Sequence, residues 1–156
     1  MQYWDEVLFP EMLKTIRGER YLLMTDKQIA DEMISLAKRA INTFKFPKVA
    51  LDYTYVEQPD SAVLPLRYYF SETVGDPELY IIVAWMKFYW CDFMVSNADN
   101  YQNIYFDNNI SAFSPGNVLH NYLSAKQKYY DEAHNLESMY YRMGDKPSIG
   151  GTIDDD

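Results

Sequence analysis

The residues of this chain that could do chemistry are few and widely spaced. There are two histidines, His120 and His134, and one cysteine, Cys91. On a single helix the two histidines would lie about four turns apart, so they could not share a metal ion. Cys91 lies in an apolar segment, where a thiol packs as a small hydrophobic side chain. These residues predict neither a metal site nor a nucleophile beside a base.

Two groups of acidic residues contain the carboxylates that a glycosidase or a two-metal site requires. The groups are Asp5, Glu6 and Glu11, and Asp131, Glu132 and Glu137. Such groups are common on solvated helix faces, and no inward-facing Glu-x-x-His motif accompanies them. The sequence therefore predicts that the chain is not an enzyme and has no cofactor and no bound metal.

The composition indicates a folded protein that does not grip nucleic acid. The 156 residues fit one domain, and 48% hydrophobic residues are too many for a disordered chain. The formal net charge of -9, without a stripe of Lys and Arg, disfavours binding to phosphates. A single cysteine favours a reducing, cytoplasmic origin, and the first eleven residues do not read as a secretory signal.

The first part of the chain predicts three helical stretches. Tyr3 to Leu8 could form a short opening helix. Pro10 either breaks this helix or starts a second turn that leads towards Ile16. Thr25 and Gln28 have the spacing of a capping box, and apolar residues then recur at helical spacing. We expect a helix from Asp26 to about Phe44.

The segment 48–70 predicts a small β-hairpin-like insertion. Val49, Leu51, Tyr53 and Tyr55 alternate with smaller or polar residues, which is typical of a strand. The range 66–70 could pair with it, and Pro65 would confine that second strand to the edge of the sheet.

The segment 76–95 predicts an apolar helix. Asp76 could cap it, Pro77 suits its first turn, and Glu78 favours its positive end. A membrane span is a weaker interpretation, since the apolar part rises only about 26 Å against a hydrocarbon core of about 30 Å. Lys87 and Asp92 would each add about 2.5–3.5 kcal/mol to the cost of insertion. We expect a central helix surrounded by other elements.

The last part predicts an ordered Asn-rich loop, 97–109, followed by a long helix that Ser114 and Pro115 begin and Gly144 ends. A mostly apolar seam, similar to the a and d positions of a heptad repeat, steps along that helix by three and four residues. It comprises Leu119, Tyr122, Lys126, Tyr129, Ala133, Leu136, Tyr140 and Met143. A helix of about 43 Å exceeds what a small core needs. The sequence thus predicts a mainly α fold, a helical bundle over residues 1–143, with a flexible acidic tail at 144–156.

Fifteen tyrosines are too many for one small core to satisfy every hydroxyl. Ordinary amphipathic packing and burial at a subunit interface both remain open for them. The interface candidates on the last helix are Tyr129, Tyr130, Tyr140, Tyr141 and Arg142.

The order of several motifs resembles a known family. They are Tyr69-Phe70, Asp76-Pro77-Glu78, Met86 and Trp90, the Asn-rich loop, and Phe113-Ser114-Pro115-Gly116-Asn117 before the last helix. Over residues 45–143 the chain is similar to the neck, or head-to-tail adaptor, proteins of tailed bacteriophages. It departs from the family pattern where Asp107 is followed by two asparagines. We include Asp107 and Phe113 among the interface candidates.

The resemblance implies a structural virion protein without catalytic activity. Its subunits would form a ring at the neck, probably twelve-fold, between the portal and a tail or second neck-ring protein. DNA would pass through without specific binding during genome ejection, and assembly would take place in the cytoplasm of the host bacterium. Three alternatives remain. They are another phage assembly role, such as tail completion or capsid connection; a small helical protein that binds a ligand around Trp85, Tyr89 and Trp90; and a peripheral membrane protein.

Overall fold

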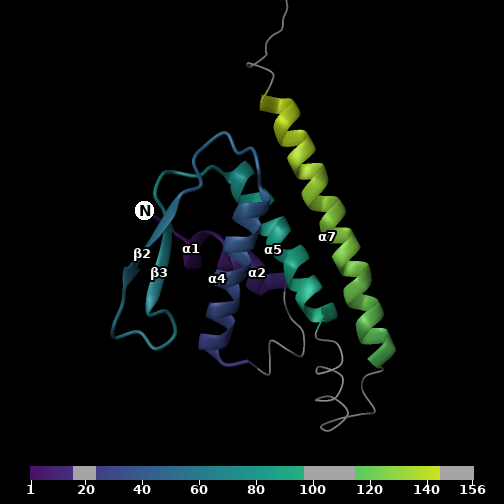
Figure 1. Ribbon diagram of the computed structural model, residues 1–156, viewed down its shortest axis with the longest axis horizontal. Helices are drawn as coiled ribbons and strands as arrows, with labels where there is room; N and C mark the ends of the chain where they lie inside the picture. The colour runs from purple at the N-terminus through teal and green to yellow at the C-terminus, as the bar shows by residue number, and fades with distance from the viewer. Residues whose placement is uncertain (16–23, 97–114, 145–156) are drawn as a thin grey trace, which may run out of the picture.

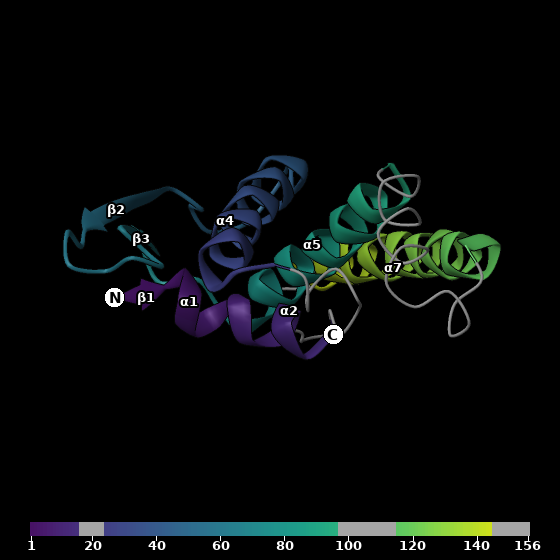
Figure 2. The ribbon, with the colours of Figure 1, turned by 90° about the horizontal axis from the view of Figure 1, so that it is seen from below.

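The structure, a computed structural model, describes residues 1–15, 24–96 and 115–144. In this part of the chain five helices accompany one small antiparallel sheet, which confirms the predicted mainly α fold with a β insertion. The sheet lies at one end of the molecule. Helices α4 (Asp26–Thr43), α5 (Asp76–Ser96) and α7 (Pro115–Gly144) follow it in space, with α5 in the middle (Figures 1 and 2).

Helix α4 begins at the predicted capping box. The Thr25 hydroxyl accepts a hydrogen bond from the Gln28 backbone N–H at 3.2 Å, and the Gln28 side-chain oxygen accepts one from the Thr25 N–H at 2.9 Å. The helix ends at Thr43, and Phe44 is its C-cap, as the helical spacing predicted. Its buried stripe, which includes Met33 and Ala37, packs against α5.

The amino-terminal segment differs from the predicted opening helix. Tyr3 belongs to a short strand, β1 (Gln2–Tyr3), which α1 (Trp4–Val7) and α2 (Phe9–Thr15) follow. Pro10 is the second residue of α2. Its missing N–H is tolerated there because the first turn of a helix has no carbonyl partner to offer. The break therefore precedes Pro10, which lies in the first turn of the second helix. Ile16 lies outside the described residues.

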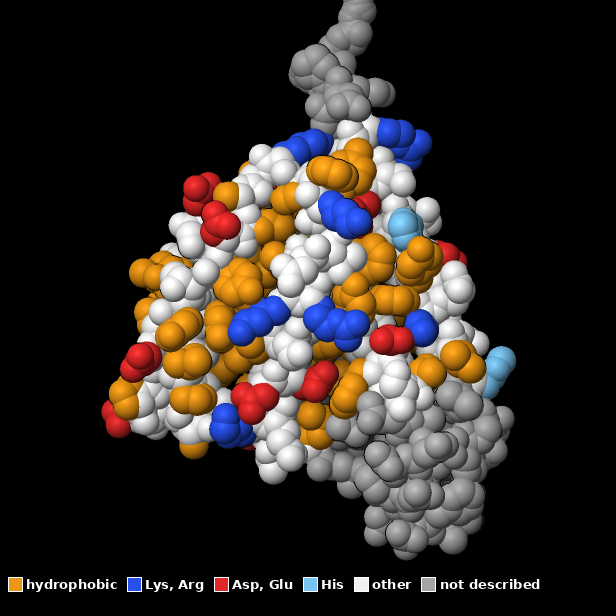
Figure 3. Space-filling view, in the orientation of Figure 1, with side chains coloured by type: hydrophobic (Ala, Val, Ile, Leu, Met, Phe, Trp, Pro, Cys, Tyr) orange, Lys and Arg blue, Asp and Glu red, His pale blue; other side chains and the backbone are white. Residues whose placement is uncertain are grey.

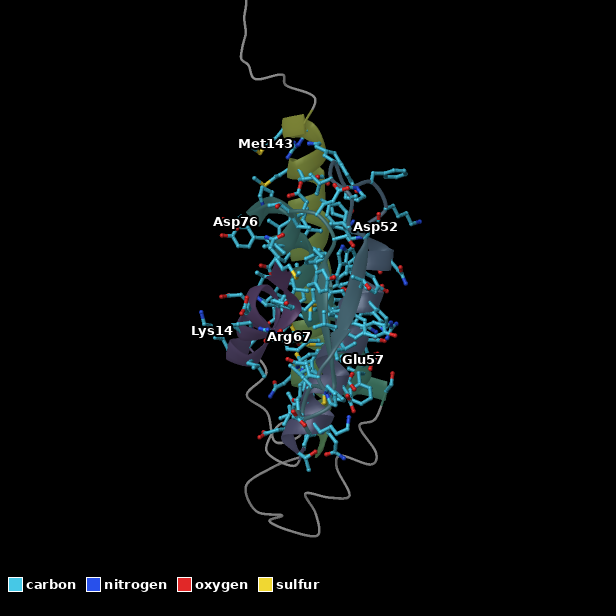
Figure 4. All side chains as sticks on the ribbon, turned by 90° about the vertical axis from the view of Figure 1, so that its left-hand side faces the viewer. Lys14, Asp52, Glu57, Arg67, Asp76 and Met143 are labelled. Carbon is cyan, nitrogen blue, oxygen red and sulfur yellow. The ribbon has the colours of Figure 1, made fainter. Side chains whose placement is uncertain are left out.

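The sheet confirms the predicted strand at 66–70 and part of the strand predicted from the alternation of Val49 to Tyr55, because Val49 and Leu51 lie before the first residue of that strand, Tyr53. It also corrects one prediction. Strands β2 (Tyr53–Glu57) and β3 (Leu66–Phe70) pair antiparallel, and the labels on Glu57 and Arg67 mark them in Figure 4. The placement of β3 at an edge was wrong, because the strand order is β1-β3-β2. Strand β1 pairs only with Phe70 and Tyr69, at the far end of β3 from Pro65. The missing N–H of Pro65 therefore costs no ladder bond there.

Helix α5 is the central element of the core. Every residue from Ile81 to Met86 is buried, which matches the absence of a polar face in the sequence. The Gly75 carbonyl accepts the first helical bond from the Leu79 N–H at 3.1 Å, so the cap position is Gly75 and not Asp76 as predicted. Length and composition alone would let α5 cross a membrane, but 56% of its most apolar stretch is buried inside the fold.

Helix α7 packs along α5 through most of the predicted seam. Ala133 and Tyr140 are buried, and Tyr122, Tyr129 and Leu136 are partly buried against the core. The charged seam residue Lys126 lies 2.9 Å from Asp92 of α5, so these two side chains pair across the helix contact.

The remaining predictions for the last part of the chain concern the end of the seam and the residues on either side of α7. Met143 was expected in the seam, but its side chain is 68% exposed because it lies at the end of α7. The Asn-rich loop, the Ser114 cap and the tail after Gly144 lie outside the described residues, as does the side chain of Leu119.

Candidate functional site

The five described interface candidates lie between the middle of α7 and its C-terminal end, in different surroundings. Tyr130 is 40% exposed and Arg142 is also exposed, whereas Tyr129 and Tyr141 are partly buried. Tyr140 is only 7% exposed, so its ring packs within the subunit. Asp107 and Phe113 lie outside the described residues.

Tyr140 joins α7 to two other parts of the fold. Its hydroxyl donates to a Glu78 carboxylate oxygen at 2.6 Å and accepts from the Lys48 backbone N–H at 2.7 Å. The Lys48 ammonium donates to the Tyr140 carbonyl at 2.7 Å and lies 4.2 Å from the centre of its ring. Burial and the hydrogen bond to Glu78 raise the pKa of Tyr140 to about 12.

Tyr141 belongs to a second network, on the neighbouring side of α7. Its hydroxyl donates to Glu137 at 2.8 Å, and the Trp85 indole N–H donates to the other oxygen of the same carboxylate at 2.5 Å. Burial and the bond to Glu137 raise the pKa of Tyr141 to about 12. Glu137 therefore holds a residue of α5 and a residue of α7 in place.

Several aromatic rings gather around Trp85, which donates to this carboxylate. Trp85 meets Phe88 edge-on at 5.6 Å and Tyr130 at 5.9 Å between ring centres. His134 lies 4.3 Å from the centre of Tyr130 and 5.5 Å from that of Trp85. On the face shown in Figure 3, hydrophobic side chains gather beside α7 in this part of the molecule.

These side chains line an open groove of about 480 Å³, which we call the Trp85 groove. Its walls come from α5, from α7 and from the end of α4 with the residues that follow it. The lining residues are Thr43, Lys45, Phe46, Trp85, Phe88, Tyr89, Tyr130, His134, Glu137, Ser138 and Tyr141.

The predicted ligand pocket around Trp85, Tyr89 and Trp90 is thus only partly brought together. Trp85 and Tyr89 line the groove, but Trp90 does not and is buried in the core. Five residues of helix turn the chain through about 500°, so Trp85 and Trp90 point to different sides of α5.

A second groove, of about 310 Å³, lies beside Met139, and we call it the Met139 groove. Its lining is almost wholly apolar apart from Lys48. The lining residues are Lys48, Pro77, Tyr80, Ile81, Leu136, Met139, Tyr140 and Met143. Tyr80 is 60% exposed and Met139 49% exposed, so apolar surface meets solvent here. Figure 4 shows Met143 and Asp76, from the ends of two different helices, at the same end of the molecule.

The structure shows the surroundings of the candidate groups Asp5, Glu6 and Cys91. In that part of the chain no three His, Cys, Asp or Glu side chains are grouped to hold a metal ion. Asp5 and Glu6 each lie 3.0 Å from Arg67 and hold α1 against β3. Cys91 is buried, and loss of hydration raises the pKa of its thiol to about 11, which leaves little reactive thiolate at neutral pH.

Sequence reasoning missed part of these surfaces. Glu78 was interpreted only as a charge favourable to the helix end, and Lys48 and Phe46 were not singled out. The partners of Glu78 and Lys48 are 62 and 92 residues away along the chain, so no local pattern indicates them. Glu137 was expected on a solvated face, but it lies between Trp85 and Tyr141. Comparison of the chain with family models, with curated proteins and with solved structures finds no match.

Proposed function

We propose that this chain is a structural protein of a tailed-phage virion, and that it forms an adaptor ring between the portal and the tail. The resemblance of residues 45–143 to neck proteins supports the proposal. In this role the subunit has no catalytic activity, and the ring surrounds the passage through which DNA leaves the head.

The observation that carries the proposal is the presence of apolar grooves on both flanks of α7. Tyr130 lines the Trp85 groove and Met139 lines the Met139 groove. Tyr130 and Met139 are nine positions apart in the sequence, so their side chains point about half a turn apart around the helix. A ring subunit meets its two neighbours through two different surfaces, as a head-to-tail contact requires. Two separate apolar surfaces on one helix suit that arrangement.

The charge of the chain also supports a passage for DNA. The formal net charge is -9, and like charge repels the phosphates of the duplex. If the wall of the passage does not bind DNA, the genome can leave the head without being held there.

Electron cryomicroscopy of portal-bearing particles, mixed with the purified protein from the same source, tests the proposal. We expect an additional ring beneath the portal, with the symmetry of the portal. Density elsewhere on the virion would replace the adaptor role by another assembly role, such as tail completion or capsid connection. Absence of any association with the particles would contradict the proposal.

A matched pair of variants tests the contribution of α7. Met139→Asp places a charge in the Met139 groove, whereas Val63→Asp places the same charge on the exposed connection between β2 and β3. Burying an unpaired carboxylate is costly, so Met139→Asp should reduce occupancy of the ring. Val63→Asp should leave it unchanged. Equal occupancy for both variants would remove the Met139 groove from the interface.

One observation favours a second candidate function, the binding of a small apolar ligand. The Trp85 groove, at about 480 Å³, is within the usual size range of ligand sites and has aromatic walls. If this function is right, the protein stays monomeric when it is mixed with the particles. It also binds a neutral aromatic probe such as phenol, and binding quenches the fluorescence of Trp85. A ring at the neck without phenol binding would dismiss it.

A further inference from the structure

The Trp85 groove contains a carboxylate whose charge no cation balances. Both oxygens of Glu137 accept hydrogen bonds, but the donors, Trp85 and Tyr141, are neutral. Among the described residues no lysine, arginine or histidine forms an ion pair with Glu137. A partly buried charge without a partner costs folding free energy, so a cation from outside the chain would stabilise Glu137.

We propose that the Trp85 groove binds an arginine side chain of a partner protein, with the guanidinium against Glu137 and between the aromatic rings. The inference concerns the chemistry of one side chain on the partner, and it does not depend on a place for this chain in a virion.

The walls of the groove have the chemistry that a cation prefers. The negative faces of aromatic rings attract cations. Trp85 is buried, whereas the ring of Tyr130 is 40% exposed and can meet a cation from outside. Trp85, Phe88 and Tyr130 meet at steep angles, so rings of different orientation surround the space beside Glu137. A contact between a guanidinium and an aromatic ring already occurs within the subunit. The Arg39 guanidinium lies 4.1 Å from the ring centre of Tyr89, another residue that lines the groove.

Arginine fits the remaining acceptor positions of the Glu137 carboxylate better than lysine does. An ionised carboxylate has about four acceptor positions, of which Trp85 and Tyr141 occupy two. The planar guanidinium can donate two parallel hydrogen bonds to the others and stack on an aromatic face at the same time. Lysine has a compact, strongly hydrated charge, which loses more hydration in a groove of this kind.

The basic side chains that line the groove do not replace the proposed partner. Lys45 and His134 also line it, but neither pairs with Glu137. The net charge of -9 attracts a basic segment to the protein from a distance. A partner protein that presents arginine on a basic surface therefore complements both the groove and the molecule.

Titration with N-acetyl-arginine amide, followed by nuclear magnetic resonance, tests the inference. This blocked amino acid presents the side chain as it occurs within a protein chain. The reported signal is the Trp85 indole N–H, assigned by its loss in Trp85→Phe. We expect a saturable shift of this signal in the millimolar range and no such shift with the neutral isostere N-acetyl-citrulline amide.

Two variants with the same change of charge separate the groove from the general charge of the protein. Glu137→Gln keeps an oxygen for the Trp85 indole and removes the charge, so it should weaken binding about tenfold, as for loss of a charge-assisted hydrogen bond. Glu132→Gln removes a charge from an exposed position of the same helix and should leave the affinity unchanged. Unchanged thermal unfolding of both variants confirms that they are folded.

The possible results decide the inference. Equal shifts with the arginine and citrulline probes, or equal affinity in Glu137→Gln and the parent protein, would overturn it. Much tighter binding of free L-arginine than of the blocked probe would assign the groove to a small molecule and overturn the protein partner. Selective binding of the blocked arginine probe that depends on Glu137 would support it, whether or not a ring forms at a portal.

Discussion

At the scale of single residues, Tyr140 differs from the other tyrosines of α7 because its hydroxyl lies inside the fold. It connects Lys48, which follows α4, with Glu78, which lies in the first turn of α5. A buried carboxylate requires such a donor, since an unsatisfied one costs much of its hydration energy. The position of Tyr140 thus stabilises the docked helix.

Tyr140→Phe should lower the free energy of unfolding by about 1–3 kcal/mol, because it leaves Glu78 and the Lys48 N–H without this partner. Urea denaturation followed by circular dichroism measures the change. Tyr130→Phe is the matched control, and since Tyr130 is exposed it should change stability by at most about 0.5 kcal/mol. Equal effects of the two substitutions would show that the Tyr140 hydroxyl does not stabilise the fold.

The raised pKa values of Tyr140 and Tyr141 predict a loss of stability in alkali. Each is raised to about 12, first by burial and then by a hydrogen bond to a carboxylate, from an ordinary value of about 10. Between these values the folded state keeps protons that the unfolded state has released, so stability falls as pH rises from about 10 towards 12. Below about pH 10 this contribution is fully present.

Urea denaturation at a series of pH values measures this slope. The double variant Tyr140→Phe/Tyr141→Phe should show a flatter dependence above pH 10, although it is less stable at neutral pH. The same slope in the parent protein and the double variant would assign the alkaline loss to other groups.

At the scale of elements, the two-residue strand β1 holds the beginning of the chain against the segment that precedes α5. Gln2 donates from its side-chain amide to the Val74 carbonyl at 2.8 Å and accepts from the Val74 N–H at 2.6 Å. Val74 is buried, so water cannot replace the two hydrogen bonds that Gln2 makes with its backbone N–H and carbonyl.

Gln2→Ala should therefore destabilise the protein by about 1–3 kcal/mol, since it leaves two backbone groups of Val74 without partners. Thermal unfolding measures the change. Gln127→Ala removes an exposed hydrogen bond to Asp131 within α7 and should leave the midpoint nearly unchanged. A loss in the Gln2 variant no larger than in the Gln127 variant would show that β1 contributes little.

At the scale of the whole molecule, the acidic charge and the exposed apolar flanks of α7 indicate different partners. The flanks offer apolar surface to proteins, whereas the net charge of -9 repels polyanions. We expect no saturable binding of a labelled DNA duplex by fluorescence anisotropy at physiological salt, up to about 100 µM protein, where non-specific DNA-binding proteins associate. Saturable binding in that range would contradict the idea of a passage that does not hold DNA.

The sequence by itself determined the elements that local chemistry specifies. The capping box of α4, the alternation that leads into β2 and the apolar run of α5 depend on residues within a few positions of one another, because helical turns and side-chain periods are local. The seam of α7 was also predictable, since its spacing indicates a single packed face. Of the three residues of the alternative ligand pocket, Trp85 and Tyr89 line one groove and Trp90 does not.

Only the tertiary structure decided which side chains meet. The pairing of β1 with β3 made a central strand of one expected at an edge, because a two-residue strand has too little periodicity to be recognised. The partners of Tyr140, and the contact of Glu137 with Trp85, join residues that are 52 to 92 positions apart. Such contacts depend on how whole helices are placed against each other, and packing of the complete core sets that placement.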